Sequence, residues 1–127
     1  MRHQLLRVLF TLSVFLIKTI SAFAQADVSS AAVKGTVTDP QGAAVAGAVV
    51  SVKDLNQGAI RTATTDSNGE FQVRLVRPGI HEITVEARGF SKYLIKDVQL
   101  TVGQTASYDI KLEVAGVKTE VVVTTSS

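Results

Sequence analysis

The sequence predicts an all-β fold, a seven-stranded Greek-key β-sandwich, and three observations support this prediction. From Asp39 onward, turn-forming residues recur about every 10 to 12 positions, a spacing that is typical of short strands in a sandwich or barrel. Apolar and polar residues alternate between the turns, so each strand has one dry face, and two sheets must pack dry face to dry face. No stretch beyond residue 24 has a convincing helical period.

Residues 1–24 have the order of parts that is typical of a secretory signal peptide. Arg2 and Arg7 give a basic start, an apolar run follows at 8–17, and Ala22-Phe23-Ala24 supplies a small-x-small cleavage site. A membrane anchor is the alternative, but Lys18 ends the apolar run short of the roughly 20 residues that a spanning helix needs. We therefore expect cleavage after residue 24 and export of the rest of the chain.

A short polar leader at 25–31 precedes strands that are separated by recognisable turns. Asp39-Pro40-Gln41-Gly42 suits a type I turn, because Pro is second and Gly fourth. Residues 56–58 and 66–69 contain Asn and Gly, which tolerate left-handed backbone, and 77–79 suits a type II turn. The expected strands are 32–38, 47–54, 59–65, 70–76, 80–87, 92–101 and 104–113.

Three of these strands show the alternation most clearly, and their inward-facing residues can be predicted from it. The predicted inward-facing residues are Phe71, Val73, Leu75, Ile83, Val85, Ala87, Ala106, Tyr108, Ile110 and Leu112. A last apolar run at 117–125 is either an eighth strand at the edge of a sheet or an extended tail, and the sequence leaves both alternatives open.

The charge balance argues against a nucleic-acid partner. The chain has 13 basic and 11 acidic residues, but Arg2, Arg7 and Lys18 lie in the expected signal peptide, which leaves 10 basic residues and a net charge of −1. Few aromatic residues and no Lys/Arg cluster remain to stack bases or bind phosphates. Cysteine is absent, so disulfides, a lipid-modified cysteine and thiolate metal ligands are excluded, and the fold depends on its core.

Several ordered segments together carry a family likeness. They are Lys34-Gly35-Thr36-Val37-Thr38-Asp39 with Gly42, Ala48-Val49-Val50-Ser51-Val52, Thr65-Asp66-Ser67-Asn68-Gly69-Glu70-Phe71, Pro78-Gly79, Ile83-Thr84-Val85-Glu86-Ala87 and Gly89-Phe90. In this order they resemble the carboxypeptidase regulatory-like domain over residues 32–113. One departure is His81, which stands where many relatives carry an aromatic residue.

The resemblance implies a transthyretin-like sandwich, also grouped with carbohydrate-binding-like folds. In the metallocarboxypeptidases that name the family, this domain lies beside the catalytic domain and contains no catalytic residue. Bacteria also place it at the N-terminus of TonB-dependent outer-membrane receptors, so the resemblance implies a location in the periplasm or on the periplasmic side of the outer membrane. Secretion remains an alternative.

The tail at 114–127 adds a second likeness. Its segment Thr119-Glu120-Val121-Val122-Val123-Thr124 is similar to a TonB box, which adds as a strand to the sheet of TonB. An extended valine-rich segment offers a free backbone edge for this kind of strand addition. In such receptors a plug and a membrane barrel follow, and this sequence ends at Ser127 without them, so any contact with the membrane would depend on the missing barrel.

Catalysis is not expected, because the residues that could carry it lack partners. A zincin helix that began at His81 would need a second histidine where Val85 stands, and this segment is predicted to be a strand. The other histidine, His3, lies in the expected signal peptide, so His81 is interpreted as a partly buried or rim histidine. No G-x-S-x-G motif is present, and no catalytic, cofactor-binding or metal-binding residues are predicted.

Two weaker binding hypotheses come from single features. Asp66, Asn68 and Glu70 could suggest calcium, but their loop is far shorter than a calcium-binding loop and Gly69 suits a hairpin turn. Phe90 could stack on a sugar if it were exposed, and so could Tyr93, although plugging one end of the sandwich is the simpler role for Phe90. No cluster of aromatic residues is predicted to form a sugar-binding platform.

Three functions therefore stay open at the level of the sequence. The first is a non-catalytic interaction module, the N-terminal extension of a TonB-dependent receptor, with TonB as the partner of residues 119–124. The second is a freestanding periplasmic or secreted domain that binds a glycan. The third is an accessory domain of a carboxypeptidase, for which this chain lacks the zinc ligands.

Overall fold

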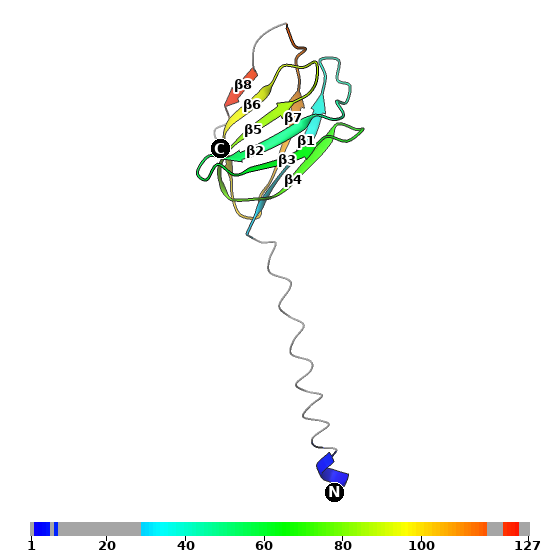
Figure 1. The fold of residues 1–127 in the computed structure, drawn as a ribbon, viewed down its shortest axis with the longest axis vertical. Helices are drawn as coiled ribbons and strands as arrows, with labels where there is room; N and C mark the ends of the chain where they lie inside the picture. Colours follow the sequence, from blue (N-terminus) through cyan, green and yellow to red (C-terminus); the bar gives the residue numbers. More distant parts are fainter. Residues whose placement is uncertain (1, 6, 8–28, 117–120, 125–127) are drawn as a thin grey trace.

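A computed structural model describes residues 2–5, 7, 29–116 and 121–124. The described part contains eight β-strands arranged in two packed sheets (Figure 1). The strands are β1 Ala31–Thr38, β2 Val49–Asp54, β3 Ile60–Thr64, β4 Glu70–Val76, β5 Gly79–Glu86, β6 Tyr93–Leu100, β7 Thr105–Lys111 and β8 Val121–Thr124. The all-β sandwich expected from the sequence is confirmed, and the eighth strand falls within the run whose structure the sequence left open.

The two sheets are unequal in size and are joined by crossing connections. One sheet has the order β4-β1-β7, and the other has the order β3-β2-β5-β6-β8. Most neighbouring strands are antiparallel, but β1 pairs with β7 in parallel and β6 pairs with β8 in parallel. In both parallel pairs, a late segment of the chain lies beside a strand that comes earlier in the sequence. The alternation of apolar and polar residues predicts which side chains share a face, but it does not predict which strands are neighbours.

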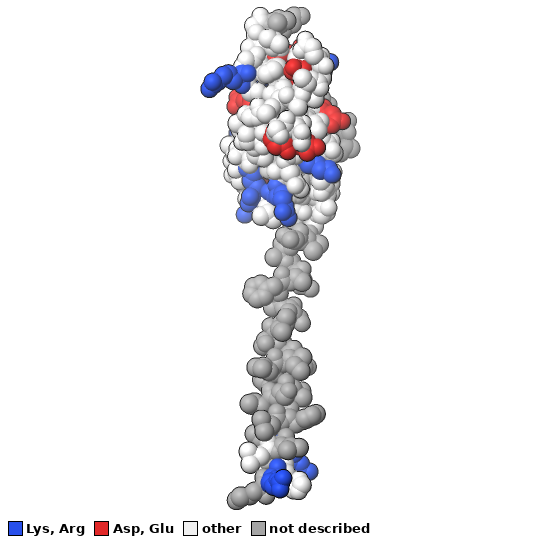
Figure 2. All heavy atoms as spheres, turned by 90° about the vertical axis from the view of Figure 1, so that its right-hand side faces the viewer, with Lys and Arg blue, Asp and Glu red and all other residues white. Residues whose placement is uncertain are grey.

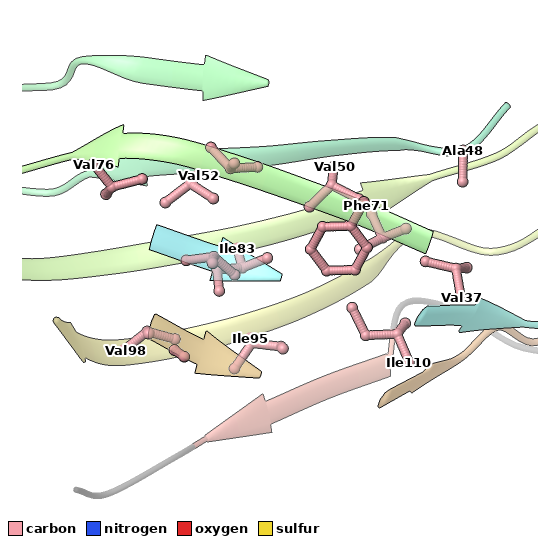
Figure 3. Close-up of a cluster of buried hydrophobic side chains, with 14 of the residues drawn as sticks. Val37, Ala48, Val50, Val52, Phe71, Val76, Ile83, Ile95, Val98 and Ile110 are labelled. Carbon is pink, nitrogen blue, oxygen red and sulfur yellow. The ribbon is translucent and has the colours of Figure 1, made fainter. Parts of the chain in front are cut away.

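The core lies between the two sheets and is built mainly from valine and isoleucine (Figure 3). Branched side chains suit this position because they pack well on a pleated surface and lose little rotamer freedom there. The most deeply buried apolar residues are Val33, Val37, Val50, Val52, Ile83, Val85, Val98, Leu100, Ile110 and Leu112. Apart from Leu75, the inward-facing residues predicted from alternation are buried or partly buried.

Leu75 is the exception, because a β-bulge reverses the direction of its side chain. Along β1 and β4, Ala31 pairs with Val76 whereas Val33 pairs with Val73, so β4 contains one extra residue in this interval. Leu75 has a positive φ of 55° and is 49 % exposed, while Val76 takes the buried position at 2 % exposure. The prediction that Leu75 faces the core was therefore wrong, since a bulge shifts the side-chain period by one residue.

Gly35 allows β1 to approach β7 closely. A Cβ atom at residue 35 would lie 1.9 Å from the carbonyl oxygen of Tyr108 and 3.1 Å from Cε1 of the Phe71 ring. The half-buried Tyr108 packs against the core, and burial raises the pKa of its phenol. Glycine is required at this strand position because any side chain would collide with backbone.

Two aspartates, Asp39 and Asp66, organise turns that separate the strands. The Oδ1 atom of Asp39 accepts the N–H groups of Gln41 and Ala43, each at 2.9 Å, and Asp66 does the same for Asn68 and Glu70. In such Asx turns the aspartate side chain accepts backbone N–H groups that have no partner in a strand ladder. The turn predictions at 39–42 and 66–69 are confirmed by the Gly42 N–H donating to the Asp39 carbonyl and the Gly69 N–H to that of Asp66, both at 3.0 Å.

The connection at 77–79 differs from its prediction. The chain bends at Pro78, and Gly79 already belongs to β5 with a φ of 140°. A type II turn places its glycine near a φ of about 80°. The prediction of a positive φ at Gly79 was right. The type II turn was wrong, because Gly79 already pairs with Leu100 in the β5–β6 ladder.

The expected signal peptide falls largely outside the described residues. Only residues 2–5 and 7 of the first 24 are described, and they are helical. Among the described residues, no helix combines the length and apolar character needed to cross a membrane. Cleavage and export therefore stay predictions.

Candidate functional site

The first candidate site is the edge of the larger sheet, where the predicted partner-binding segment lies. Its residues Thr119 and Glu120 are outside the described part of the chain. Its remaining residues, Val121 to Thr124, form β8 and pair in parallel with residues 93–96 of β6. The structure therefore favours the strand interpretation of this run over the free tail for these four residues.

The contacts of β8 are limited compared with those of the other strands. It pairs over four residues, with Val121 opposite Tyr93 and Thr124 opposite Lys96. Val122 is 49 % exposed, and Val123 is partly buried. In the sheet order β8 is the last strand, so within the described residues its outer edge faces no further strand. An edge strand of this kind presents backbone N–H and C=O groups that can pair with another chain.

A second candidate site is a polar recess over the smaller sheet. It has a volume of about 560 Å³, and its lining includes Lys34, Thr36, Gln72 and Asp109. The hydroxyl of Thr36 donates to Oδ1 of Asp109 at 2.9 Å, which links β1 to β7 on this outer face. On one side of the sandwich, acidic side chains gather across the middle and basic side chains lie above and below them (Figure 2). The lining of the recess is itself polar and mixed in charge, because it contains Lys34 together with Asp66, Glu70 and Asp109.

A third candidate site is a smaller recess at one end of the sandwich. It has a volume of about 290 Å³ and contains Asp54, His81, Arg61 and Arg77. His81 is only 1 % exposed, and its Nδ1 atom lies 3.0 Å from the carbonyl oxygen of Gly79. The interpretation of His81 as a partly buried or rim residue was wrong, because β5 directs this side chain into the same inner layer as Ile83 and Val85.

Asp54 is the cross-strand neighbour of His81 and is also buried, at 6 % exposure. Its Oδ1 atom accepts the N–H of Asn56 at 2.8 Å and that of Gln57 at 3.2 Å. The hydrogen bond from Asn56 is the main cause that holds the pKa of Asp54 below its usual value of 3.8, while burial opposes this and the Gln57 bond adds to it. The sequence analysis placed a turn at 56–58 and did not recognise Asp54 as the residue that organises it.

The remaining single-residue hypotheses resolve into structural roles. Phe90 and Tyr93 are both partly buried, and both pack against the core. Asp66, Asn68 and Glu70 make the hairpin turn described above. The described residues contain no group of three or more His, Cys, Asp or Glu side chains that could hold a metal ion.

The fold defines this chain as a two-sheet β-sandwich module. The family model of the carboxypeptidase regulatory-like domain matches residues 32–113. The chain belongs to the carboxypeptidase regulatory-like domain family, and the resemblance found from its turn and strand motifs is confirmed.

Solved structures with the same fold have low sequence identity to this chain. The TIE protein of Bacillus anthracis has a TM-score of 0.56 at 21% identity, over 68% of this chain and 17% of that chain. A protein from Bacteroides uniformis named for carbohydrate binding has a TM-score of 0.53 at 21% identity, over 65% and 41%. Hydroxyquinol 1,2-dioxygenase from Pseudomonas putida has a TM-score of 0.50 at 17% identity, over 72% and 58%.

These similarities concern the fold alone. In each case the chain spans less than two thirds of the length of the solved chain that it matches. One of the three proteins is named for carbohydrate binding and another is an enzyme, so the shared sandwich does not decide a function. The function has to be argued from the sites of this chain.

Proposed function

We propose that this chain is a non-catalytic interaction module of the bacterial envelope, the N-terminal extension of a TonB-dependent outer-membrane receptor. Membership of a regulatory-like domain family supports a role in binding rather than catalysis. The partner-binding segment is residues 119–124, with TonB as the partner. Export to the periplasm through residues 1–24 belongs to the same proposal.

The observation that carries this proposal is the parallel pairing of Val121–Thr124 with β6 at the edge of the larger sheet. Within the part of the chain that the structure describes, these residues already form a strand by adding to the edge of a sheet, in parallel, over four positions. Strand addition to a partner sheet uses the same backbone groups and the same extended conformation. A strand that lies last in its sheet, with Val122 half exposed, can exchange the edge of β6 for the edge of another protein.

A pull-down with the periplasmic domain of TonB tests the proposal. We expect the full chain to bind, and binding to be lost when residues 119–124 are replaced by an equally long Gly-Ser segment. Val122→Asp should weaken binding, because aspartate disfavours a strand. Val102→Asp is the matched control, since Val102 is also an exposed valine, at 59 % exposure, but lies in the turn before β7.

Two results would count against the TonB assignment. Binding that survives the Gly-Ser replacement would show that residues 119–124 are not the contact. Equal losses in the Val122→Asp and Val102→Asp variants would show that exposed apolar surface, rather than strand addition, drives the interaction.

A second candidate function is glycan binding by a freestanding domain, and the recess over the smaller sheet favours it. Its lining combines donors and acceptors, including Lys34, Gln72, Ser107 and Asp109, in a volume of about 560 Å³ that suits a small ligand. The fold is shared with a protein named for carbohydrate binding. A glycan array probed with the full chain tests this function, and Gln72→Ala together with Asp109→Ala should abolish any signal that the recess produces.

A further inference from the structure

Four segments close the sandwich at the end where β1 begins. They are Ser30 and the turns at 55–59, 77–78 and 101–104. The Gly103 N–H donates to the Ser30 carbonyl at 3.0 Å. Leu75 connects the segments, because it lines one recess together with Ser30 and Gly103 and another together with Gln57 and Arg77. We call this surface the basal end, and it is the lower end of the sandwich in Figure 1.

Large apolar side chains are exposed at the basal end, each between 41 % and 59 %. They are Leu55, Ile60, Leu75, Ile80 and Val102. The Leu55 N–H donates to the Ile80 carbonyl at 3.0 Å, so these two residues are neighbours. The other large apolar side chains exposed in the described sandwich, Val49, Val114 and Val122, lie away from this end. Apolar surface that gathers in one place marks an interaction site.

Leu75 reaches this surface through a strained backbone. Its φ of 55° lies in the left-handed region, which a bulky side chain seldom adopts. Burial does not offset the strain, because the side chain is half exposed. Strained residues of this kind cluster at binding sites, where the surrounding structure enforces them. The strain therefore points to a binding role for the outward side chain of Leu75.

The basal end is positively charged. Arg61, Arg74 and Arg77 line its two recesses. Figure 2 shows basic side chains below the acidic ones that cross the middle of the sandwich, on the side of the basal end. Arg77 donates to the neutral side chain of Gln57 and keeps its charge. The turns of this end contain no acidic residue, and the carboxylate of Asp54, which borders it, is buried.

The opposite end of the sandwich carries charges of both signs. Its turns contain the acidic residues Asp39, Asp66 and Glu113 and the basic residues Arg88 and Lys92. Positive charge beside exposed aliphatic side chains is therefore a property of the basal end. The three arginines lie on different segments, so no basic run in the sequence marks this surface.

The residue types at the basal end favour a membrane over other partners. No aromatic residue lies in its turns, whereas single-stranded nucleic acids stack on aromatic rings and protein hot spots are rich in Trp and Tyr. Aliphatic side chains beside basic ones are what surface-bound helices present to the membrane interface. Arginine adds a planar fork of donors that matches a phosphate group.

We propose that the basal end docks on the surface of a membrane that contains anionic phospholipids. Leu75 and its apolar neighbours enter the interfacial layer, and Arg61, Arg74 and Arg77 contact lipid phosphates. The contact gives the sandwich a membrane attachment of its own. It uses no residue of β8 or of the recess over the smaller sheet, so it stands independently of both candidate functions.

Tryptophan fluorescence tests the proposal at single positions, because the sequence contains no tryptophan. The test uses the chain from residue 25 onward, since the apolar run at 8–17 would itself bind lipid vesicles. The core residues of the described sandwich lie between Ala31 and Leu112, so this form keeps them, and circular dichroism checks its fold.

We expect vesicles of phosphatidylglycerol and phosphatidylcholine in equal parts to shift the emission of the Leu55→Trp variant to shorter wavelength. Val114→Trp is the matched control. Val114 is 48 % exposed and Leu55 is 45 % exposed, but Val114 lies outside the basal end, so its emission should not change.

Vesicle sedimentation measures the contribution of charge. Arg74→Ala should weaken binding to the same vesicles about fivefold, because it removes one basic side chain from the anionic surface. Arg88→Ala, which removes an exposed arginine from the opposite end, should leave binding unchanged. The parent chain should bind vesicles of phosphatidylcholine alone far more weakly, since these carry no net charge.

Leu75→Asn separates a binding role from a structural one. Asparagine adopts a positive φ more readily than leucine, so the variant should unfold at the same temperature as the parent chain or higher. Its affinity for the anionic vesicles should fall about tenfold, because an apolar side chain is lost from the interface. A lower melting temperature would show that Leu75 supports the fold, and the argument from strain would fail.

Three outcomes would overturn the proposal. If Leu55→Trp and Val114→Trp respond equally, or neither responds, the basal end is not the contact. If Arg74→Ala and Arg88→Ala weaken binding equally, the vesicles attract the chain through its overall charge. If the chain ignores vesicles but forms dimers that Leu75→Asn abolishes in size-exclusion chromatography, the basal end is an interface between two copies.

Discussion

Two parallel pairs of strands hold late segments of this chain, and they differ in what their side chains bury. β7 pairs with β1 over seven residues, from Thr105 opposite Ala32 to Lys111 opposite Thr38, and it places Ile110 in the core at 2 % exposure. β8 pairs with β6 over four residues and leaves Val122 49 % exposed. Both ladders are parallel, and we expect β7 to be held more firmly than β8 because its described ladder is longer and because it buries more apolar surface.

The comparison indicates how a strand can belong to a sheet and still be able to leave it and pair with another protein. The inner face of β7 contributes Ala106 and Ile110 to the core, whereas none of the β8 side chains that the structure describes belongs to it. Strands with few buried contacts open at low free-energy cost and are the natural source of exchangeable elements. We therefore expect β8 to open without the rest of the sandwich.

The largest effect is expected from truncating the buried side chain of β7. Ile110→Ala should lower the free energy of unfolding by about 2–5 kcal/mol, because it removes buried methyl groups and leaves a cavity. Chemical denaturation followed by circular dichroism measures this, with Val122→Ala in β8 as the control. If Ile110→Ala lowers the free energy of unfolding no more than Val122→Ala does, then β7 does not contribute more to stability than β8.

A somewhat smaller loss is expected where β1 approaches β7. Gly35→Ala places a Cβ atom 1.9 Å from the Tyr108 carbonyl oxygen, so the two strands must separate. Overpacking of this kind costs about 1–3 kcal/mol in the free energy of unfolding. Thermal denaturation checks the loss. An unchanged melting temperature would show that the β1–β7 ladder is looser than its geometry indicates.

Acid should lower the free energy of unfolding of the sandwich as a whole, and it should not affect the β1–β7 and β6–β8 pairs differently. The folded state lowers the pKa of Asp54 below 3.8, so the ionised carboxylate contributes stability that is complete above this value and is lost as pH falls through the folded-state pKa. Asp54→Asn should reduce the slope of stability against pH in this acid range. If the variant and the parent chain show the same acid profile, the turn that Asp54 organises does not contribute.

The smallest effect is expected in β8. Val122→Ser should change the free energy of unfolding by no more than about 0.5 kcal/mol, because the side chain is half exposed at an edge. Hydrogen exchange gives the sharper measurement: amides of β8 should exchange far faster than those of β7. Equal protection in the two strands would show that β8 is an integral part of the sandwich, and would weaken the proposal that it exchanges with a partner.

The sequence predicted the elements well where their causes are local. All seven expected strands are present within a few residues of their predicted bounds, because alternation and Asp/Gly turns act over short distances. Leu75 departs from its prediction because a bulge depends on the register with β1, and that register involves residues about 45 positions away.

The candidate sites were less predictable than the elements. The tail was singled out from its valine-rich pattern, but its pairing with β6 depends on which sheet edge the fold leaves open. His81 was recognised as the only histidine outside residues 1–24, yet its burial beside Asp54 follows from the pairing of β5 with β2. The Nε2 atom of His81 has no hydrogen-bond partner among the residues that the structure describes, and no local signal in the sequence marks this, because it depends on every element packed around the ring.

The amino-acid sequence by itself determined the all-β class, the strands, the main turns and the family, since each depends on backbone preferences and side-chain periods within a short window. Tertiary structure decided the two parallel pairings, the outward turn of Leu75 and the burial of His81 with Asp54. Contacts between distant residues determine these features: the hydroxyl of Thr36 reaches Asp109, which is 73 positions further along the chain. Such contacts form only when the two sheets close over a shared core, because burial of apolar surface depends on the whole fold.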